Sequence, residues 1–80
     1  MTLLTRLFRP LKKPQRPSTL ECCYYVGKEF SFAFLEDPVS LVVFKVVELD
    51  YPSEDMILRA ASLWATERGY NLTYRKLNNA

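Results

Sequence analysis

The sequence contains no histidine and only two glycines, and both shortages exclude kinds of active site. Without histidine the commonest general base is missing, and the usual Ser-His or Cys-His nucleophilic pairs cannot be assembled. Gly27 and Gly69 stand far apart, so there is no glycine-rich loop to cradle a phosphate. We therefore expect no catalytic residues and a protein that is not an enzyme.

Cysteine is also scarce, with two adjacent residues, Cys22 and Cys23. Neighbouring residues of a strand point to opposite faces, so the pair does not form a disulfide framework. A zinc ion would have to be held by these two thiols plus carboxylates, which is an improbable ligand set. The sequence therefore predicts no metal and no cofactor, with both cysteines acting as small apolar residues of a strand. It also predicts no small-molecule substrate, because so short a chain is not expected to enclose a pocket of about 300 Å³.

Long apolar runs are absent as well. The longest uncharged apolar stretch, residues 39–44, is far shorter than the roughly 20 residues that a membrane-spanning helix needs. No apolar run follows the first charges of the chain, as a secretory signal requires. We expect a cytoplasmic protein. Contact with a membrane surface is not expected, because the apolar face of the first residues is short for that task.

The first part of the chain has no negative charge. Residues 1–20 contain five basic residues and no acidic one, whereas residues 21–80 contain six basic and nine acidic residues. The five are Arg6, Arg9, Lys12, Lys13 and Arg16. Prolines at positions 10, 14 and 17 favour an extended backbone. We expect residues 1–19 to form a basic, proline-punctuated arm whose cations contact phosphates or an acidic partner.

The whole chain has 80 residues, so it has room for one core, which is predicted at residues 20–77 and followed by a tail at 78–80. Alternating apolar residues predict strands, and a 3.6-residue period between Ser53 and Gly69 predicts a helix with a serine N-cap and a glycine C-terminal turn. The predicted strands cover residues 20–26, 29–35, 39–49 and 70–77, and the helix covers 54–68. The fold expected is α+β: a small two-layer sandwich in β-β-β-α-β order, with a mostly antiparallel four-stranded sheet and one packed helix.

The third predicted strand is apolar on both sides, so both faces of the sheet are expected to be buried, but one helix can cover only one face. We expect the apolar stripe of the helix, with Trp64, to pack against Phe30, Phe32 and Phe34 on the second strand. The other face then holds a candidate partner surface, made of Val42, Phe44, Val46, Tyr25 and Leu35. Its cover is either the arm, through Leu3, Leu4, Leu7 and Phe8, or a second protein chain.

These observations favour a non-enzymatic small binding or regulatory protein that acts through protein-protein contacts. A protein partner or a homodimer is expected in preference to nucleic acid. The size suits an accessory or inhibitor protein of a phage or mobile element. The alternative is a nucleic-acid-binding module that uses the basic arm, since flexible cationic arms contact phosphates without sequence specificity.

Overall fold

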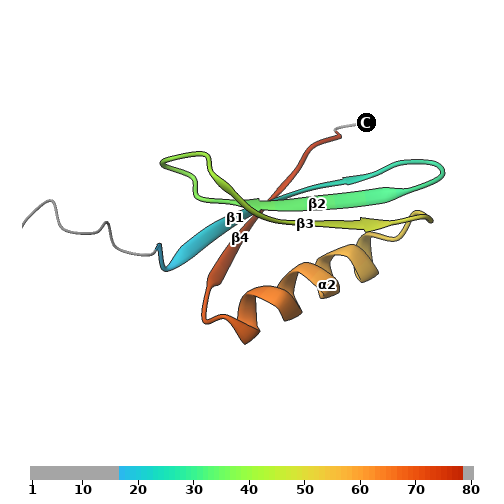
Figure 1. Cartoon of the computed structure of the whole chain (residues 1–80). Coiled ribbons are helices and arrows are strands. Elements are labelled where there is room, and N and C mark those ends of the chain that lie inside the picture. The colour runs from blue at the N-terminus through green and yellow to red at the C-terminus, as the bar shows by residue number, and fades with distance from the viewer. Residues whose placement is uncertain (1–16, 79–80) are drawn as a thin grey trace, which may run out of the picture.

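Four strands and one helix make up the part of the chain that the computed structural model describes, residues 17–78 (Figure 1). They are β1 (Thr19–Val26), β2 (Ser31–Glu36), β3 (Val43–Leu49), α2 (Glu54–Glu67) and β4 (Asn71–Lys76). The five basic residues of the predicted arm all lie outside the described residues. No helix within the described part is long and apolar enough to cross a membrane.

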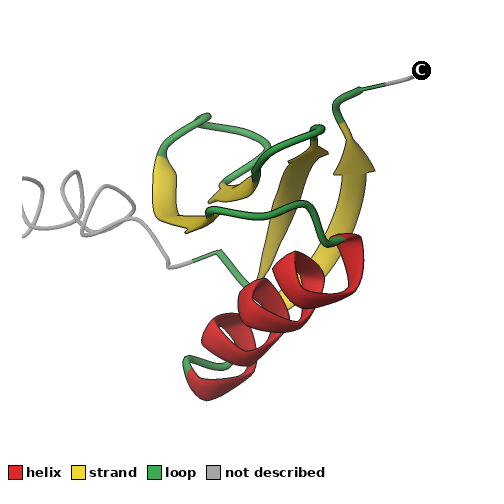
Figure 2. Cartoon of the chain, turned by 90° about the vertical axis from the view of Figure 1, so that its right-hand side faces the viewer, coloured by secondary structure: helices red, strands yellow, loops and turns green. Residues whose placement is uncertain are grey.

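The strands form one sheet in the order β3-β2-β1-β4, and α2 packs on one of its faces (Figure 2). The predicted α+β sandwich in β-β-β-α-β order is confirmed. The pairs β1–β2 and β2–β3 are antiparallel, but β1 and β4 are parallel, so the sheet is mixed rather than mostly antiparallel. The parallel pair arises because α2 returns the chain from the β3 edge to the opposite edge, where β4 runs in the direction of β1.

The helix ends as its sequence signals predict. The Met56 backbone N–H donates to the Ser53 hydroxyl at 3.1 Å, which satisfies one of the free amides of the first turn. At the other end Gly69 adopts a φ of 81°, a left-handed conformation that glycine takes without a Cβ penalty. The next amide, that of Tyr70, then donates back to the Ala65 carbonyl at 2.9 Å.

The third strand begins four residues later than the sequence predicts, because the chain closes into a loop first. The Leu41 N–H donates to the Asp37 carbonyl at 2.7 Å, and the Asp37 N–H donates to the Val42 carbonyl at 2.9 Å. These bonds occupy backbone groups that would otherwise pair with β2. The apolar residues 39–42 therefore belong to a loop and not to a strand.

The core lies between α2 and the sheet, and its sheet side is the opposite of the one predicted. Its fully or nearly fully buried members come from β1, β2 and α2: Leu20, Cys22, Tyr24, Ala33, Leu35, Ile57, Ala61 and Ala65. Within β2 the side chains that face the helix are therefore those of Ser31, Ala33 and Leu35.

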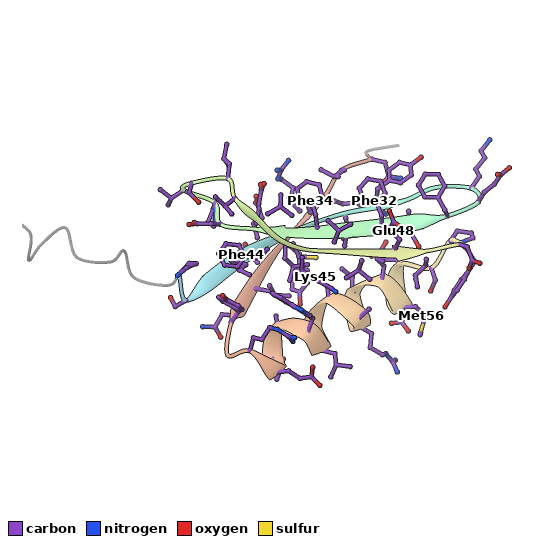
Figure 3. The ribbon with its side chains drawn as sticks, in the orientation of Figure 1. Phe32, Phe34, Phe44, Lys45, Glu48 and Met56 are labelled. Atoms are coloured by element: carbon purple, nitrogen blue, oxygen red, sulfur yellow. The ribbon has the colours of Figure 1, made fainter. Side chains whose placement is uncertain are left out.

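The expectation that Phe30, Phe32 and Phe34 pack against Trp64 was wrong. Phe30 is 47% exposed, and Figure 3 shows Phe32 and Phe34 on the side of the sheet away from α2. The physical reason is space. Alanines at 33, 61 and 65 allow the helix to approach the sheet closely, and a row of phenylalanines there would hold it away. The Trp64 ring instead stacks on Tyr70, with centroids 5.9 Å apart.

Candidate partner-binding surface

The face of the sheet away from α2, here called the open face, carries a row of three aromatic rings. Tyr25 stacks on Phe32 with centroids 5.4 Å apart, and the Phe30 centroid lies 5.7 Å from Tyr25 and 6.2 Å from Phe32. The β1–β2 turn allows this arrangement. A Cβ at Gly27 would lie 2.7 Å from the Tyr25 ring, so the absence of a side chain lets the ring rest against the turn.

A groove opens beside these rings where β2 begins and β3 ends. It is about 530 Å³ in volume and is lined by Phe30, Phe32, Glu48, Leu49 and Asp50. Its floor is aromatic, and its wall carries two carboxylates. Such a groove suits a group that combines an apolar surface with a positive charge, because cations are attracted both to carboxylates and to ring faces.

A cluster of polar groups lies at the other end of the open face. The Arg75 guanidinium donates to the Glu21 carboxylate at 3.4 Å and to the Cys23 sulfur at 3.3 Å. The Cys23 thiol in turn lies 3.6 Å from a Glu21 oxygen and 3.9 Å from a Glu36 oxygen. Burial, followed by the neighbouring Glu21 charge, raises the pKa of the Cys23 thiol to about 11, although Arg75 opposes this. The hydrogen bond to Glu21 likewise raises the pKa of Arg75.

This cluster contains a set of atoms that a metal ion could contact. The ligand atoms of Glu21, Cys23 and Glu36 all lie within 4.8 Å of one another. However, the Arg75 side chain already contacts two of the three residues. A metal binds the thiolate, whereas the raised pKa of Cys23 favours the protonated thiol. The arrangement therefore works as an ion-pair cluster that fixes this end of the open face.

A second surface, here called the apolar edge, runs along β3 and the loop before it. Its six large apolar side chains are all exposed: Val39, Leu41, Val42, Val43, Phe44 and Val46. The side chain of Val39 is 90% exposed and that of Leu41 is 64% exposed. Because β3 is the outer strand, its outward backbone groups have no strand partner among residues 17–78.

The loop that carries this edge is held in one shape by Asp37. Its carboxylate accepts hydrogen bonds from the Val39 N–H and from the Ser40 hydroxyl, both at 3.0 Å. The Val39 bond first and the Ser40 bond second lower the pKa of the Asp37 carboxyl. Leu41 adopts a φ of 65°, which is strained for a residue with a branched side chain. The loop therefore keeps a strained backbone conformation in which its apolar side chains remain exposed to solvent.

The five residues of the predicted partner surface do not lie on one surface of the structure. Val42, Phe44 and Val46 are exposed on the apolar edge, and Tyr25 lies in the aromatic row on the open face. Leu35 was placed wrongly. Its side chain is fully buried in the core, because it shares the helix-facing side of β2 with Ala33.

Phe44 differs from its neighbours on the edge. The pairing of β2 with β3 skips Phe44, because Leu35 pairs with Lys45 and Glu36 pairs with Val43. The Phe44 ring meets the Tyr70 ring edge-on, with centroids 5.8 Å apart. Tyr70 itself packs at the margin of the core. Phe44 therefore joins the apolar edge to the packed interior.

Sequence reasoning missed that Phe32 and Phe34 of β2 face away from α2, and it missed the exposure of the loop residues Val39 and Leu41. One signal for β2 was available. Ser31 and Ala33 are as small as Ala61 and Ala65 of the helix, and small residues at matched positions mark a close approach between two elements. No comparable signal marks the loop, because Asp37 and Ser40 are ordinary turn residues.

Comparison of the chain with protein-family models, with curated proteins and with solved structures gave no significant match.

Proposed function

We propose that this chain is a non-enzymatic binding or regulatory protein that docks its apolar edge on another protein. The observation that carries the proposal is the strained, hydrogen-bonded loop that holds Val39 and Leu41 in solvent next to an apolar outer strand. Burial of apolar area is the main driving force of protein association. A partner strand alongside β3 would in addition pair its free backbone groups.

The two edges of the sheet support this proposal by their contrast. Outer strands are normally protected by charged residues, which discourage pairing with other chains. Each edge strand carries two charged residues, Arg75 and Lys76 on β4 and Lys45 and Glu48 on β3. The other exposed residues of β4 are Asn71, Thr73 and Tyr74, whereas those of β3 are Val43, Phe44 and Val46. The β3 edge is therefore the more apolar of the two and the better suited to contact.

We propose that the chain acts in the cytoplasm, where its two free thiols, Cys22 and Cys23, would stay reduced.

Site-specific crosslinking tests the docking surface. A photoreactive amino acid at Val39 should crosslink to one protein species in cells of the host, whereas the same group at Leu63 on α2 should not. Leu63 is a matched control because it is also apolar and 60% exposed, but it lies away from the apolar edge. The measurement is the mass of the crosslinked product, before and after nuclease treatment. Equal crosslinking from both positions, or none from Val39, contradicts the proposal.

Nucleic-acid binding is the second candidate, and the aromatic row favours it. Rings exposed on a sheet can stack on the bases of single strands, and the arm adds five positive charges. The carboxylates of Glu36, Glu48 and Asp50 on or beside the same face would however repel phosphates. We therefore rank this function second.

Salt dependence separates the two candidates. If each of the five arm cations neutralised one duplex phosphate, the slope of log affinity against log salt would approach about −4.5. We expect weak binding of DNA and RNA at about 150 mM salt, where exposed charges are screened. Submicromolar binding that disappears when the five cations become alanine would place nucleic acid first.

A further inference from the structure

We infer that the open face is the binding site for the chain's own basic arm, residues 1–16, with the proline-flanked cations of the arm seated in the aromatic groove. The groove lies beyond the apolar edge, although Val46 of that edge pairs with Phe34 and so shares the open face. The inference does not depend on the function proposed above. Charge, side-chain chemistry and the length of the arm support it.

The open face and the arm have complementary charges. The strand register places Glu21, Glu36 and Glu48 on the side of the sheet that carries Phe32 and Phe34. The one cation placed there by the register, Arg75, is already paired with Glu21. Glu36 and Glu48 have no ion-pair partner within residues 17–78. The arm is complementary, because it contains five basic residues and no acidic one.

The side chains of the groove suit a segment rich in proline and cations. The groove joins the rings of Phe30 and Phe32 to the carboxylates of Glu48 and Asp50. Aromatic-lined grooves bind extended proline-rich segments, which lose little entropy on binding because their backbone is already restricted. Residues 9–17 of this chain read RPLKKPQRP, in which prolines alternate with cations. The segment and the groove therefore have matching chemistry.

The arm is long enough to reach the groove. The Ser18 carbonyl accepts the Asn71 N–H at 2.9 Å, so the arm starts at the end of the sheet where Glu21 pairs with Glu36. The groove lies at the other end, and β1 between them spans about 23 Å at about 3.3 Å per residue. An extended proline-rich chain advances about 3.1 Å per residue.

About eight residues therefore carry the chain back from Ser18 to the groove at that rise per residue. This length places Arg9 and Pro10 over the aromatic floor. Arg16 then lies near the end of the sheet that carries Glu21 and Glu36. The spacing of the arm's cations thus matches the two acidic ends of the open face.

A spin-label experiment on the full chain tests this inference. A nitroxide is attached to the variant Leu11→Cys. The native thiols are fully buried, so labelling is directed to the new site. The amide signals of Phe32 and Glu48 should be broadened several-fold more than those of Arg59 and Leu63 on α2. The broadening should decrease as salt is raised, because screening weakens the ion pairs.

Charge-neutral variants supply the control. Glu48→Gln with Asp50→Asn should abolish the broadening at Phe32. Asp55→Asn with Glu67→Gln removes the same amount of charge from the helix and should leave the broadening unchanged. Both double variants change exposed side chains only, and their amide spectra report whether the sheet is intact.

Three results would overturn the inference. The first is equal broadening over α2 and the open face, or none on the open face. The second is loss of broadening in both double variants. The third is broadening of isotope-labelled chains that carry no nitroxide when they are mixed with spin-labelled chains, because the arm of a second copy would then occupy the groove.

Discussion

Replacing Leu35 with alanine is expected to lower the free energy of unfolding by about 2 to 5 kcal/mol. Its side chain is fully buried between β2 and α2, so the change removes apolar contacts and leaves a cavity. Phe30→Ala should cost about 1 kcal/mol or less, although it deletes a larger side chain, because the ring is half exposed on the open face. Urea unfolding followed by circular dichroism measures both values, and the midpoint should move without a change in slope.

The comparison of these two variants decides which face of β2 is covered. A larger loss for Phe30→Ala than for Leu35→Ala would mean that the phenylalanines face the helix, as their pattern in the sequence suggested. A control at Phe34, which is partly buried on the open face, should give an intermediate value.

Raising the pH above 9 is expected to destabilise the folded chain through Cys22. Burial, with a smaller contribution from the Cys23 charge, raises the pKa of the Cys22 thiol from 9.0 to about 11. The folded chain then holds this proton more tightly than the unfolded chain does, so unfolding releases a proton between these two pH values. The stabilisation is complete below pH 9 and is lost as the pH rises toward 11, by about 3 kcal/mol at most.

The variant Cys22→Ala isolates this effect from other groups that titrate at high pH. Urea unfolding at pH 8 and at pH 10.5 should show a larger loss of stability for the natural chain than for the variant. An equal loss in the two chains would mean that the thiol has no raised pKa. An independent measurement is the reaction with an aromatic disulfide reagent at pH 8. This reaction should be at least about 100-fold slower in the native chain than in urea, because the thiolate fraction falls tenfold for each unit of pKa and the thiol is also buried from the reagent.

Local signals in the sequence were sufficient for the helix and for the order of the elements. Ser53 and Gly69 mark the helix ends by hydrogen-bond and backbone chemistry that depends on no distant residue. The two-residue period likewise identified the strands at 20–26 and 70–77 to within one residue of β1 and β4. The α+β class follows from that order.

The covered face of β2 could not be obtained in the same way. A two-residue period states that Phe32 and Ala33 point to opposite sides, but it does not state which side the helix takes. Greater hydrophobicity favoured the phenylalanines. In the structure α2 covers the side of β2 that carries the smaller residues, because Ala61 and Ala65 bring the helix close to the sheet there. This packing is a tertiary effect that the local sequence pattern does not encode.

The candidate surface was accessible to sequence reasoning in part. The apolar character of positions 42, 44 and 46 on a strand with too many apolar residues indicated a contact surface, and the structure leaves all three exposed. The groove was not predictable. It requires Glu48 and Asp50 to meet Phe30 and Phe32, which lie at least 16 positions away in the sequence, and only the register of β2 with β3 brings them together.

The parallel pairing of β1 with β4 has a consequence for the order of folding. Cys23 and Arg75 are neighbours across this pair although they are 52 positions apart, whereas β1, β2 and β3 are joined by short turns. Closing the long loop costs more entropy, so the three-stranded hairpin unit should form first and β4 should add last. Until it does, the free side of β1 is a second unprotected edge, and slowly folding chains are exposed to aggregation there as well as at β3.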